Sequence, residues 1–405
     1  MGALIYPSVA ARHMAGVIDK EIRLLASLVQ LLSSGGDARI LLDPDTGLNR
    51  YFSAPVPSDT LAYASSTANG ISAAANAHLA NVLERLGDDL SAAEYSKALE
   101  GLRARIRAAY AVPADVEIVL APSGTDLEYV ALTCVAGRAP GGIHNILLGA
   151  DEVGSGCIRS AHGLYFAGET ALGLETWPGA PVPGLGGPEL DLIDIPVRDA
   201  AGGVRPSADI AARMGEAIRL AASASKHTLV HVVHGSKTGL ILPNLADVDR
   251  LRAEHGDAIT LIVDACQARI TSAAVNAYLD RGAIVFVTGS KFMGGPPFSG
   301  IALVPPALAA QAPRLAEGLA TIFRRAEWPA SWPGAETLPD GANPGVLLRL
   351  EASIFELERF QRLAPETVER IILAFHAAVM PRRSSVERVR ISTGWMSASS
   401  RSPGG

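Results

Sequence analysis

The sequence has few cysteines, few aromatic residues and no long run of apolar residues. Its three cysteines, Cys134, Cys157 and Cys266, are too few and too scattered for a disulfide framework or a zinc knuckle. No apolar run reaches the roughly 18–20 residues that cross a bilayer. The first residues also lack the basic and apolar regions of a signal peptide. We therefore expect a soluble, cytoplasmic protein without a metal site.

Charge of one sign is also never concentrated. The net charge is −6, and no run of like charges is long enough for a nucleic-acid or membrane patch. Hydrophobic residues make up 48% and charged residues 19% of the 405 residues, as in an ordinary globular protein. This length is sufficient for one large domain and a smaller one.

Short strands and helices alternate along most of the chain. Two helices are predicted over residues 71–86 and 91–110, the second with the capping-box spacing of Ser91 and Glu94. Strands rich in Val, Ile and Leu then alternate with helices, and residues 178–206 form an excursion of turns and short strands. The predicted strands cover residues 117–121, 144–149, 227–233, 260–263, 283–287 and, running back antiparallel, 299–304. This alternation predicts a mostly parallel sheet covered on both faces.

Two of these strands end in charged residues that suit one cofactor. Asp264 closes the strand Leu261-Ile-Val-Asp, and Lys291 follows the next strand, 27 positions later. Pyridoxal phosphate (PLP) needs a lysine that forms a Schiff base and an acid that keeps the pyridine nitrogen protonated. The alternatives are that Asp264 caps the following helix and that Lys291 is an ordinary surface side chain.

A phosphate site is predicted where the first strand leads into a helix. Ser123, Gly124 and Thr125 occupy this turn, and a helix start offers free N–H groups to an anion. Taken alone, Ser123 is better explained as a helix cap. Thr288 and Ser290, just before Lys291, would add hydroxyl donors.

A third strand end adds Ser236, whose hydroxyl is expected to reach the phenolic oxygen of the cofactor ring.

The ordered motifs Ser-Gly-Thr, Ser-x-Thr-Gly, Asp-x-x-Gln and Ser-Lys resemble the fold type I PLP enzymes, and most closely the class V aminotransferase and cysteine desulfurase group. The resemblance covers residues 60–360. It implies an α/β fold of three layers, with a mostly parallel seven-stranded sheet and a small, shortened C-terminal α+β segment. It also implies a homodimer with the active site at the subunit interface, where residues of the second copy complete the phosphate contacts.

By this resemblance, Lys291 is the Schiff-base lysine and Asp264 is the partner of the pyridine nitrogen. Gln267 and Ser236 match residues near the phenolic oxygen. The phosphate cup corresponds to Gly124, Thr125, Thr288 and Ser290.

The sequence departs from that family in two places near the cofactor. Where the family has an aromatic or histidine ring that stacks on the cofactor, this chain has Val153; either Val153 packs on the ring or another group such as His162 substitutes. No cysteine follows Cys266, so the family's desulfuration route is not expected.

Candidates for substrate binding are less well defined. Arg390, in Arg388-Val-Arg-Ile-Ser, resembles the arginine that binds the substrate carboxylate in the family, and Arg349 is the rival. Either could equally be a solvated surface charge. Arg50, Ser66 and Thr67 are weaker candidates, for which turn and capping roles are the alternative.

We expect a PLP-dependent transferase or lyase that acts on the amine of an amino acid or a similar metabolite and stabilises a carbanion at Cα. The absent stacking ring favours elimination or replacement over ordinary transamination. A non-catalytic scaffold with the same fold is the alternative from another class. The expected segments are an arm and substrate entrance (1–60), a large cofactor domain (61–340) and a small C-terminal domain (341–405) with a disordered tail.

Overall fold

The computed structural model describes residues 25–60, 64–87, 89–154 and 156–379. The chain divides into two units, residues 1–356 and residues 357–405. The first unit contains the sheet and the candidate site. The predicted boundaries at residues 60 and 340 stay predictions.

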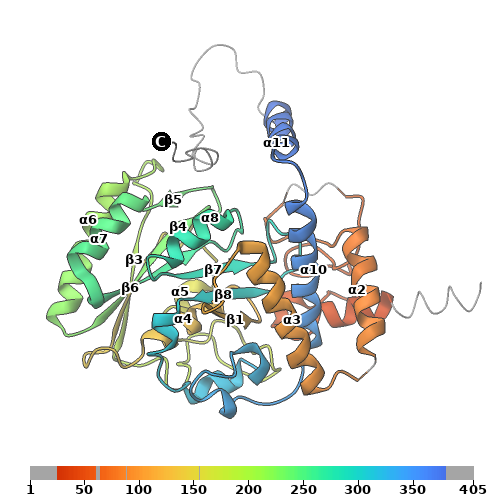
Figure 1. Cartoon of the computed structure of the whole chain (residues 1–405), viewed down its shortest axis with the longest axis horizontal. Coiled ribbons are helices and arrows are strands. Elements are labelled where there is room, and N and C mark those ends of the chain that lie inside the picture. The colour runs from red at the N-terminus through yellow and green to blue at the C-terminus, as the bar shows by residue number, and fades with distance from the viewer. Residues whose placement is uncertain (1–24, 61–63, 88, 155, 380–405) are drawn as a thin grey trace, which may run out of the picture. The chain divides into compact units, whose positions relative to one another are not determined.

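A single mixed sheet forms the centre of the first unit (Figure 1). Its strands follow one another in the order β1-β8-β7-β6-β4-β2-β3, and a two-residue β5 pairs with β4. Strands β7, β6, β4, β2 and β3 are parallel, whereas β8 runs antiparallel to both of its neighbours, β1 and β7. The strands are β1 (Glu117–Ala121), β2 (Ile143–Leu148), β3 (Leu190–Ile195), β4 (His227–His234), β5 (Ile241–Leu242), β6 (Ile259–Asp264), β7 (Ile284–Thr288) and β8 (Gly300–Val304).

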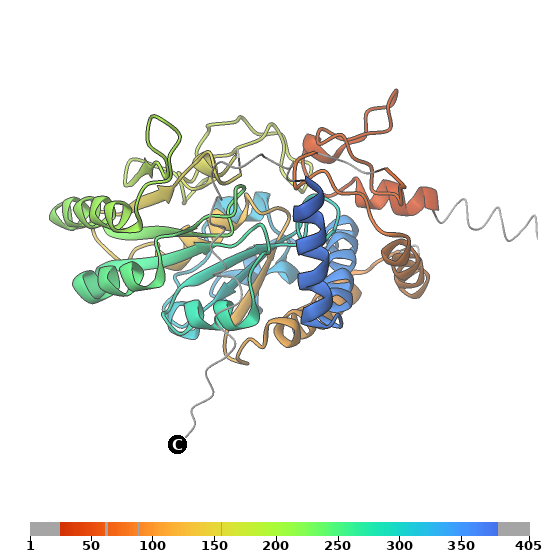
Figure 2. The ribbon, with the colours of Figure 1, turned by 90° about the horizontal axis from the view of Figure 1, so that it is seen from above.

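The central strands are buried along nearly their whole length, because helices cover both faces of the sheet. The crossovers through α6 (Ser207–Ser223), α7 (Leu245–His255) and α8 (Ser272–Leu279) all step in the same direction along the sheet, towards β7. The crossover through α4 (Leu127–Val135) steps in the opposite direction. Right-handed crossovers therefore put α4 on the other face, as Figures 1 and 2 show. All nine residues of α4 are buried. The helices on the two faces and the sheet between them make three layers.

The helices begin where the sequence offers capping groups. Ser91 and Glu94 form the predicted capping box of α3, while Ser72, Asn244 and Thr271 each accept a hydrogen bond from a backbone N–H in the first turn of α2, α7 and α8. Residues 25–32 are also helical. The remaining helices are α2 (Ala73–Leu86), α3 (Ala92–Tyr110), α5 (Cys157–Ser160), α9 (Pro306–Ala309), α10 (Pro344–Gln361) and α11 (Pro365–Val379), with short 3-10 turns η1 (Ala38–Ile40), η2 (Gly256–Ala258), η3 (Glu317–Thr321), η4 (Arg325–Glu327) and η5 (Ala335–Thr337).

The predicted fold class is confirmed: a mostly parallel sheet of seven main strands is the middle one of three layers. The excursion predicted over residues 178–206 contains β3, a full strand of the sheet. Between residues 341 and 379 the described chain is helical, so the predicted α+β character is not seen in that stretch. Residues 380–405, and Arg390 with them, lie outside the described residues.

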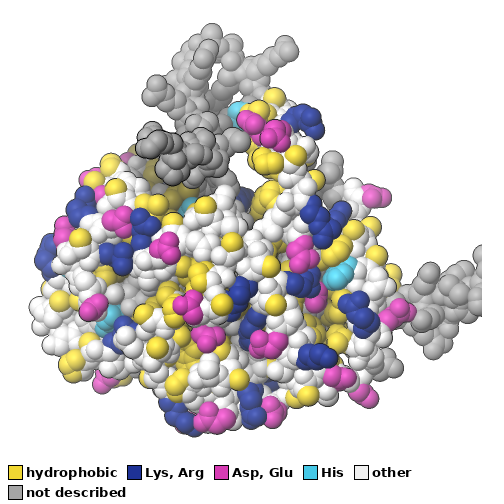
Figure 3. Space-filling view, viewed as in Figure 1, with side chains coloured by type: hydrophobic (Ala, Val, Ile, Leu, Met, Phe, Trp, Pro, Cys, Tyr) yellow, Lys and Arg dark blue, Asp and Glu magenta, His cyan; other side chains and the backbone are white. Residues whose placement is uncertain are grey.

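Charged side chains of both signs are interspersed on the face shown in Figure 3. None of the helices in the described part of the chain combines the length and the apolar character needed to span a membrane.

Candidate active site

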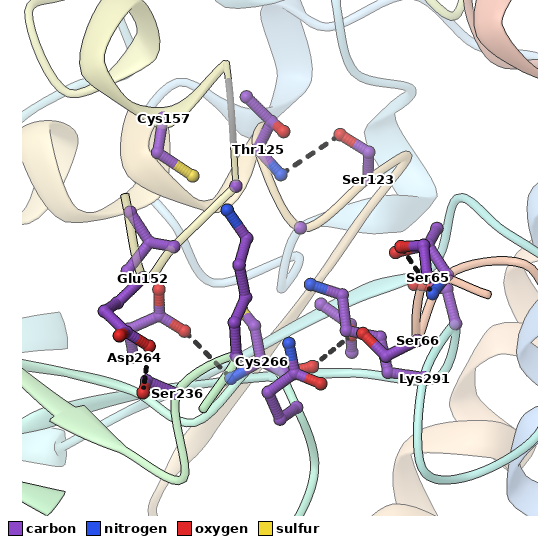
Figure 4. Close-up of a pocket in the computed structure, with 18 of the residues that line it drawn as sticks. Ser65, Ser66, Ser123, Thr125, Glu152, Cys157, Ser236, Asp264, Cys266 and Lys291 are labelled. Carbon is purple, nitrogen blue, oxygen red and sulfur yellow. Dashed lines mark hydrogen bonds between the residues drawn. The ribbon is translucent and has the colours of Figure 1, made fainter. Parts of the chain in front are cut away.

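A cavity of about 670 Å³ opens at the carboxyl ends of β4, β6 and β7, within the unit of residues 1–356. These strands are neighbours in the sheet, so the residues that follow them meet at one edge. The start of α4 and residues 64–67 and 152–154 line other parts of the wall. Figure 4 shows Thr125, Asp264 and Lys291 around this hollow.

Lys291 lines the cavity three residues after the end of β7. Its carbonyl oxygen accepts hydrogen bonds from Asn69 Nδ2 at 3.1 Å and from the backbone N–H of Gly294 at 2.8 Å. Its side-chain amine makes no hydrogen bond or ion pair with any described residue. The backbone of Lys291 is therefore held while its amine is available.

Asp264 is the last residue of β6, is half-buried and lines the same cavity. Its Oδ1 accepts a hydrogen bond from the backbone N–H of Cys266 at 2.9 Å. Gln267, only 5% exposed, lies three residues further, and its Oε1 has no hydrogen-bond partner among the described residues. A buried polar atom without a partner is costly, so this amide is an obvious contact for a ligand.

The turn before α4 lines the cavity, but the Ser123 hydroxyl forms its hydrogen bonds within that turn. Its Oγ donates to Asp126 Oδ2 at 2.6 Å and accepts from the N–H groups of Thr125 and Asp126. The Ser123 hydroxyl proton is therefore not directed at a phosphate, contrary to the prediction. Thr125 lines the cavity and its hydroxyl makes no hydrogen bond within the described residues.

Gly124 is required by a close approach rather than by its backbone angles. A Cβ at this position would lie 2.6 Å from Cγ2 of Thr288, at the end of β7. The glycine lets the start of α4 lie directly against that strand end.

Thr288 and Ser290 both line the cavity, but only one keeps a free hydroxyl. Thr288 Oγ1 donates to the carbonyl oxygen of Cys266 at 2.6 Å, so its proton is engaged within the protein, and its contact with a phosphate stays a prediction. The Ser290 side chain, 5% exposed, forms no hydrogen bond with the described residues.

Ser236 lies in the cavity wall beside Glu152, a residue that the sequence did not single out. Ser236 Oγ donates to Glu152 Oε2 at 2.7 Å, and Thr238 and Arg198 also donate to this carboxylate. Burial alone would raise the pKa of Glu152, but the hydrogen bonds from Ser236 and Thr238 outweigh burial and lower the pKa. The Ser236 hydroxyl proton is therefore engaged in the hydrogen bond to Glu152. Towards a ligand, this hydroxyl can only accept a hydrogen bond.

No ring stands at the position where the family carries one. Val153 lines the cavity and is 6% exposed. His162 is absent from the lining; its Nε2 lies 2.9 Å from the carbonyl oxygen of Leu190. Of the two sequence alternatives, only Val153 is at the cavity.

Arg349 does not reach the cavity. Its side chain is fully buried, and its guanidinium donates to the carbonyl oxygens of Phe298, Leu32, Ser34 and Gly35 at 2.6–3.0 Å. Four of its five N–H donors bond these carbonyl oxygens and Arg349 is absent from the cavity lining, so the structure does not bring this candidate to the site.

The other substrate candidates are divided between two hollows. Ser66 and Thr67 line the cavity, and Figure 4 shows Ser66 beside Lys291. Arg50 instead lines a neighbouring groove that shares Arg39 and Tyr51 with the cavity.

Two arginines of the lining were missed by sequence reasoning. Arg39 forms two-pronged hydrogen bonds with Asp37 and lies over the rings of Phe166 and Phe298, at 5.0 and 4.7 Å from their centroids. No local sequence pattern indicates that Arg39 lies at the cavity. Arg269 lies two residues after Gln267, within the strand-end segment that the sequence had already marked.

The two cysteines of the lining are protected thiols. Burial raises the pKa of both Cys157 and Cys266 above the usual range for a thiol. A thiol with a raised pKa forms little of the nucleophilic thiolate at neutral pH.

No protein-family model and no curated protein sequence matches this chain. The fold is similar to several solved structures. A complex of the cystine C–S lyase C-DES with its product cysteine persulfide is 16% identical, with a TM-score of 0.47; the match covers 73% of this chain and 71% of the other.

Two further similar structures are an aminotransferase and a cysteine desulfurase. The pyridoxamine–pyruvate aminotransferase of Mesorhizobium loti is 18% identical with a TM-score of 0.45, over 78% of this chain and 67% of the other. The cysteine desulfurase CsdA of Escherichia coli is 15% identical with a TM-score of 0.46, over 78% and 73%.

Proposed function

We propose that this protein is a PLP-dependent transferase or lyase that acts on the amine of an amino acid or a similar metabolite. The observation that carries the proposal is that the Lys291 amine and the Asp264 carboxylate line one cavity whose wall includes the start of α4. In proteins that bind this cofactor, an amine holds its reactive carbon, a carboxylate pairs with its ring nitrogen, and a helix start holds its phosphate.

The residues present fit this cofactor. The start of α4 offers the N–H of Gly124 and the unpartnered hydroxyl of Thr125, with Ser290 nearby in the lining. The buried Oε1 of Gln267, without a partner among the described residues, would gain one from a bound ligand. When bound, PLP supplies an electron sink for the carbon next to the substrate amine.

The protein's own groups have distinct tasks in this proposal. Asp264, at the end of β6, provides the negative charge that favours a protonated ring nitrogen. Lys291, whose amine has no described partner, holds the cofactor at rest and then moves the proton at Cα of the substrate. Glu152 is already saturated with donors, so its task is to fix the wall around Ser236.

We propose elimination or replacement at the substrate as the reaction. Val153, rather than an aromatic ring, faces the cavity, and this supports chemistry other than ordinary transamination. The proposal includes a homodimer, because two large apolar side chains, Phe52 and Trp177, are 83% and 82% exposed on this subunit. A reducing, cytoplasmic setting is supported by the absence of any disulfide: all three cysteines are free.

The absorbance spectrum of the purified protein tests the cofactor assignment. We expect a visible band that borohydride removes irreversibly, with the reduced cofactor attached to Lys291 in a peptide digest. The Lys291→Ala variant should fold and lose the band. A band that persists unchanged in that variant, or the absence of a band after incubation with PLP, would refute the proposal.

The type of reaction follows from the products. Elimination releases ammonia from amino acids with a leaving group at Cβ or Cγ, whereas transamination moves the amino group to an added 2-oxo acid. We expect the leaving group to be released without amino-group transfer, together with ammonia in an elimination, or in exchange for an added nucleophile in a replacement. Transfer without ammonia would establish the aminotransferase alternative.

A further inference from the structure

Arg269 is the charged residue of the cavity that has no partner and no task in the proposed chemistry. The other cations of the lining, apart from Lys291, are engaged: Arg39 pairs with Asp37, and Lys237 donates to the carbonyl oxygen of Asp151. Arg269 makes no hydrogen bond or ion pair with any residue that the structure describes. A half-buried guanidinium with five free donors is well suited to an anion that enters the cavity.

The backbone before Arg269 adopts an uncommon conformation that directs this residue. Ala268 has φ +57°, in the left-handed region that costs most non-glycine residues about 1 kcal/mol. Its N–H donates to the carbonyl oxygen of Ala265 at 2.7 Å and closes a turn. Arg269 leaves this turn beside Gly235, where an added Cβ would lie 3.3 Å from Arg269 Cβ. Such strain is retained where it positions a functional group.

Arg269 is also remote from the predicted phosphate site. Gly124 lies against Thr288 at the end of β7, whereas Arg269 lies against Gly235, just after β4. In the sheet, β6 separates these two strands. Two strand spacings amount to about 10 Å, more than one phosphate group spans. The cavity therefore has two places for an anion, with Asp264, at the end of β6, on the strand between them.

We propose that Arg269 binds a carboxylate of the substrate, so that the cavity selects amino acids over simple amines. This inference rests on the proposed function, because it assigns the second anion site to the substrate of the same cavity. It takes the place of Arg349, which is buried outside the cavity with four of its five N–H donors engaged. Arginine suits this task because its planar fork can hold both carboxylate oxygens at once.

Succinate and its neutral diamide, succinamide, are matched probes that do not depend on turnover. Isothermal titration calorimetry of the full chain should detect binding of succinate. We expect Arg269→Gln to weaken that binding about 10- to 100-fold, the usual effect of one charged hydrogen bond. Arg269→Lys should retain part of the affinity. Arg213→Gln removes an exposed arginine of α6 and should change nothing. Succinamide should not distinguish any of the variants.

The cofactor-loaded protein gives the second readout. Spectral titration with L-alanine and with ethylamine, which lacks the carboxylate, should show that Arg269→Gln raises the apparent Kd for L-alanine only. Equal succinate affinity in Arg269→Gln and the wild type would overturn the proposal, as would no succinate binding to the wild type. An equal loss for L-alanine and ethylamine would also overturn it, since the effect would then be structural.

These outcomes are separable from failure of the proposed function. The visible band of the wild type and its loss in Lys291→Ala report on the cofactor, whereas succinate binding reports on Arg269 alone.

Discussion

Two arginines of this molecule, Arg349 and Arg269, have opposite surroundings. Arg349 is fully buried, and its guanidinium donates to four backbone carbonyl oxygens. Arg269 lines the cavity and has no partner among the described residues. Both are charged, but only the second retains hydrogen-bonding capacity for a ligand.

The same contrast holds for the regions around them. The carbonyl groups of residues 32–35 and of Phe298 are joined through Arg349, so that its charge connects segments far apart in the sequence. In the cavity, Lys291 and Arg269 have no partner among the described residues, and Gln267 Oε1 is buried without one. Saturated polar groups hold the fold together, whereas unsaturated ones mark the site where a ligand completes the bonding.

The largest expected effect is at the saturated arginine. Arg349→Leu leaves four carbonyl oxygens without their donor, and since a buried polar group without a partner costs about 1–3 kcal/mol, we expect the free energy of unfolding to fall by several kcal/mol. Urea denaturation measures this change. Arg269→Leu, which removes no internal partner, should change stability by less than about 0.5 kcal/mol. Equal losses in the two variants would contradict the distinction drawn between them.

The next effect concerns a buried acid at the cavity edge. Burial raises the pKa of Asp126 to about 7, although the Ser123 hydroxyl and the Arg39 guanidinium act in the opposite direction. A carboxyl whose pKa is higher in the folded state stabilises the fold fully below its unfolded pKa, near 4. That contribution is lost as the pH rises to about 7.

Asp126→Asn should therefore gain stability relative to the wild type as the pH rises from about 4 to 7, by about 1.4 kcal/mol per pH unit at most. Thermal melts of both proteins at several pH values measure the difference. Glu327, whose pKa burial also raises to about 7, should behave in the same way when changed to Gln. A difference that does not vary with pH would show that Asp126 is ionised in the fold throughout this range.

The smallest of these effects tests a saturated charge inside the cavity wall. Glu152→Gln replaces a carboxylate that accepts from Ser236, Thr238 and Arg198. We expect a loss of about 1.5–3 kcal/mol in stability and little change in succinate affinity. Urea denaturation and calorimetry on the same sample measure the two quantities. A large loss of succinate binding with normal stability would mean that Glu152 belongs to the ligand site.

Much of the fold could be predicted from the sequence, because the signals are local. The alternation of apolar strands with helices predicted the sheet, and Ser91 with Glu94 predicted the start of α3. Gly294 and the prolines after it correctly indicated that the next strand, β8, returns antiparallel. The strand β3 was not predicted as such because it lies at the edge of the sheet, where only its first and last residues are buried.

The cavity lining was predicted more completely than the bonding of its hydroxyl groups. Strand-end positions follow from the topology, so Asp264, Thr288 and Lys291 were expected at one edge. Hydroxyl orientation depends on neighbours that are distant in sequence: Thr288 donates to Cys266, and Ser236 to Glu152. The spacing of residues in the sequence does not indicate whether a hydroxyl group will donate to an acceptor in the protein or to a ligand.

The sequence alone determined the order of strands and helices, and with it the residues that meet at the carboxyl edge of the sheet. Hydrophobic periodicity and capping groups act over a few residues, so they can be recognised in the sequence alone. Only the tertiary structure decided which charged side chains are engaged by partners inside the protein. Arg349 and Arg269 look equally available in the sequence. The difference between them arises because backbone carbonyls from two separate segments surround the first, whereas the turn at Ala268 leaves the second beside an open cavity.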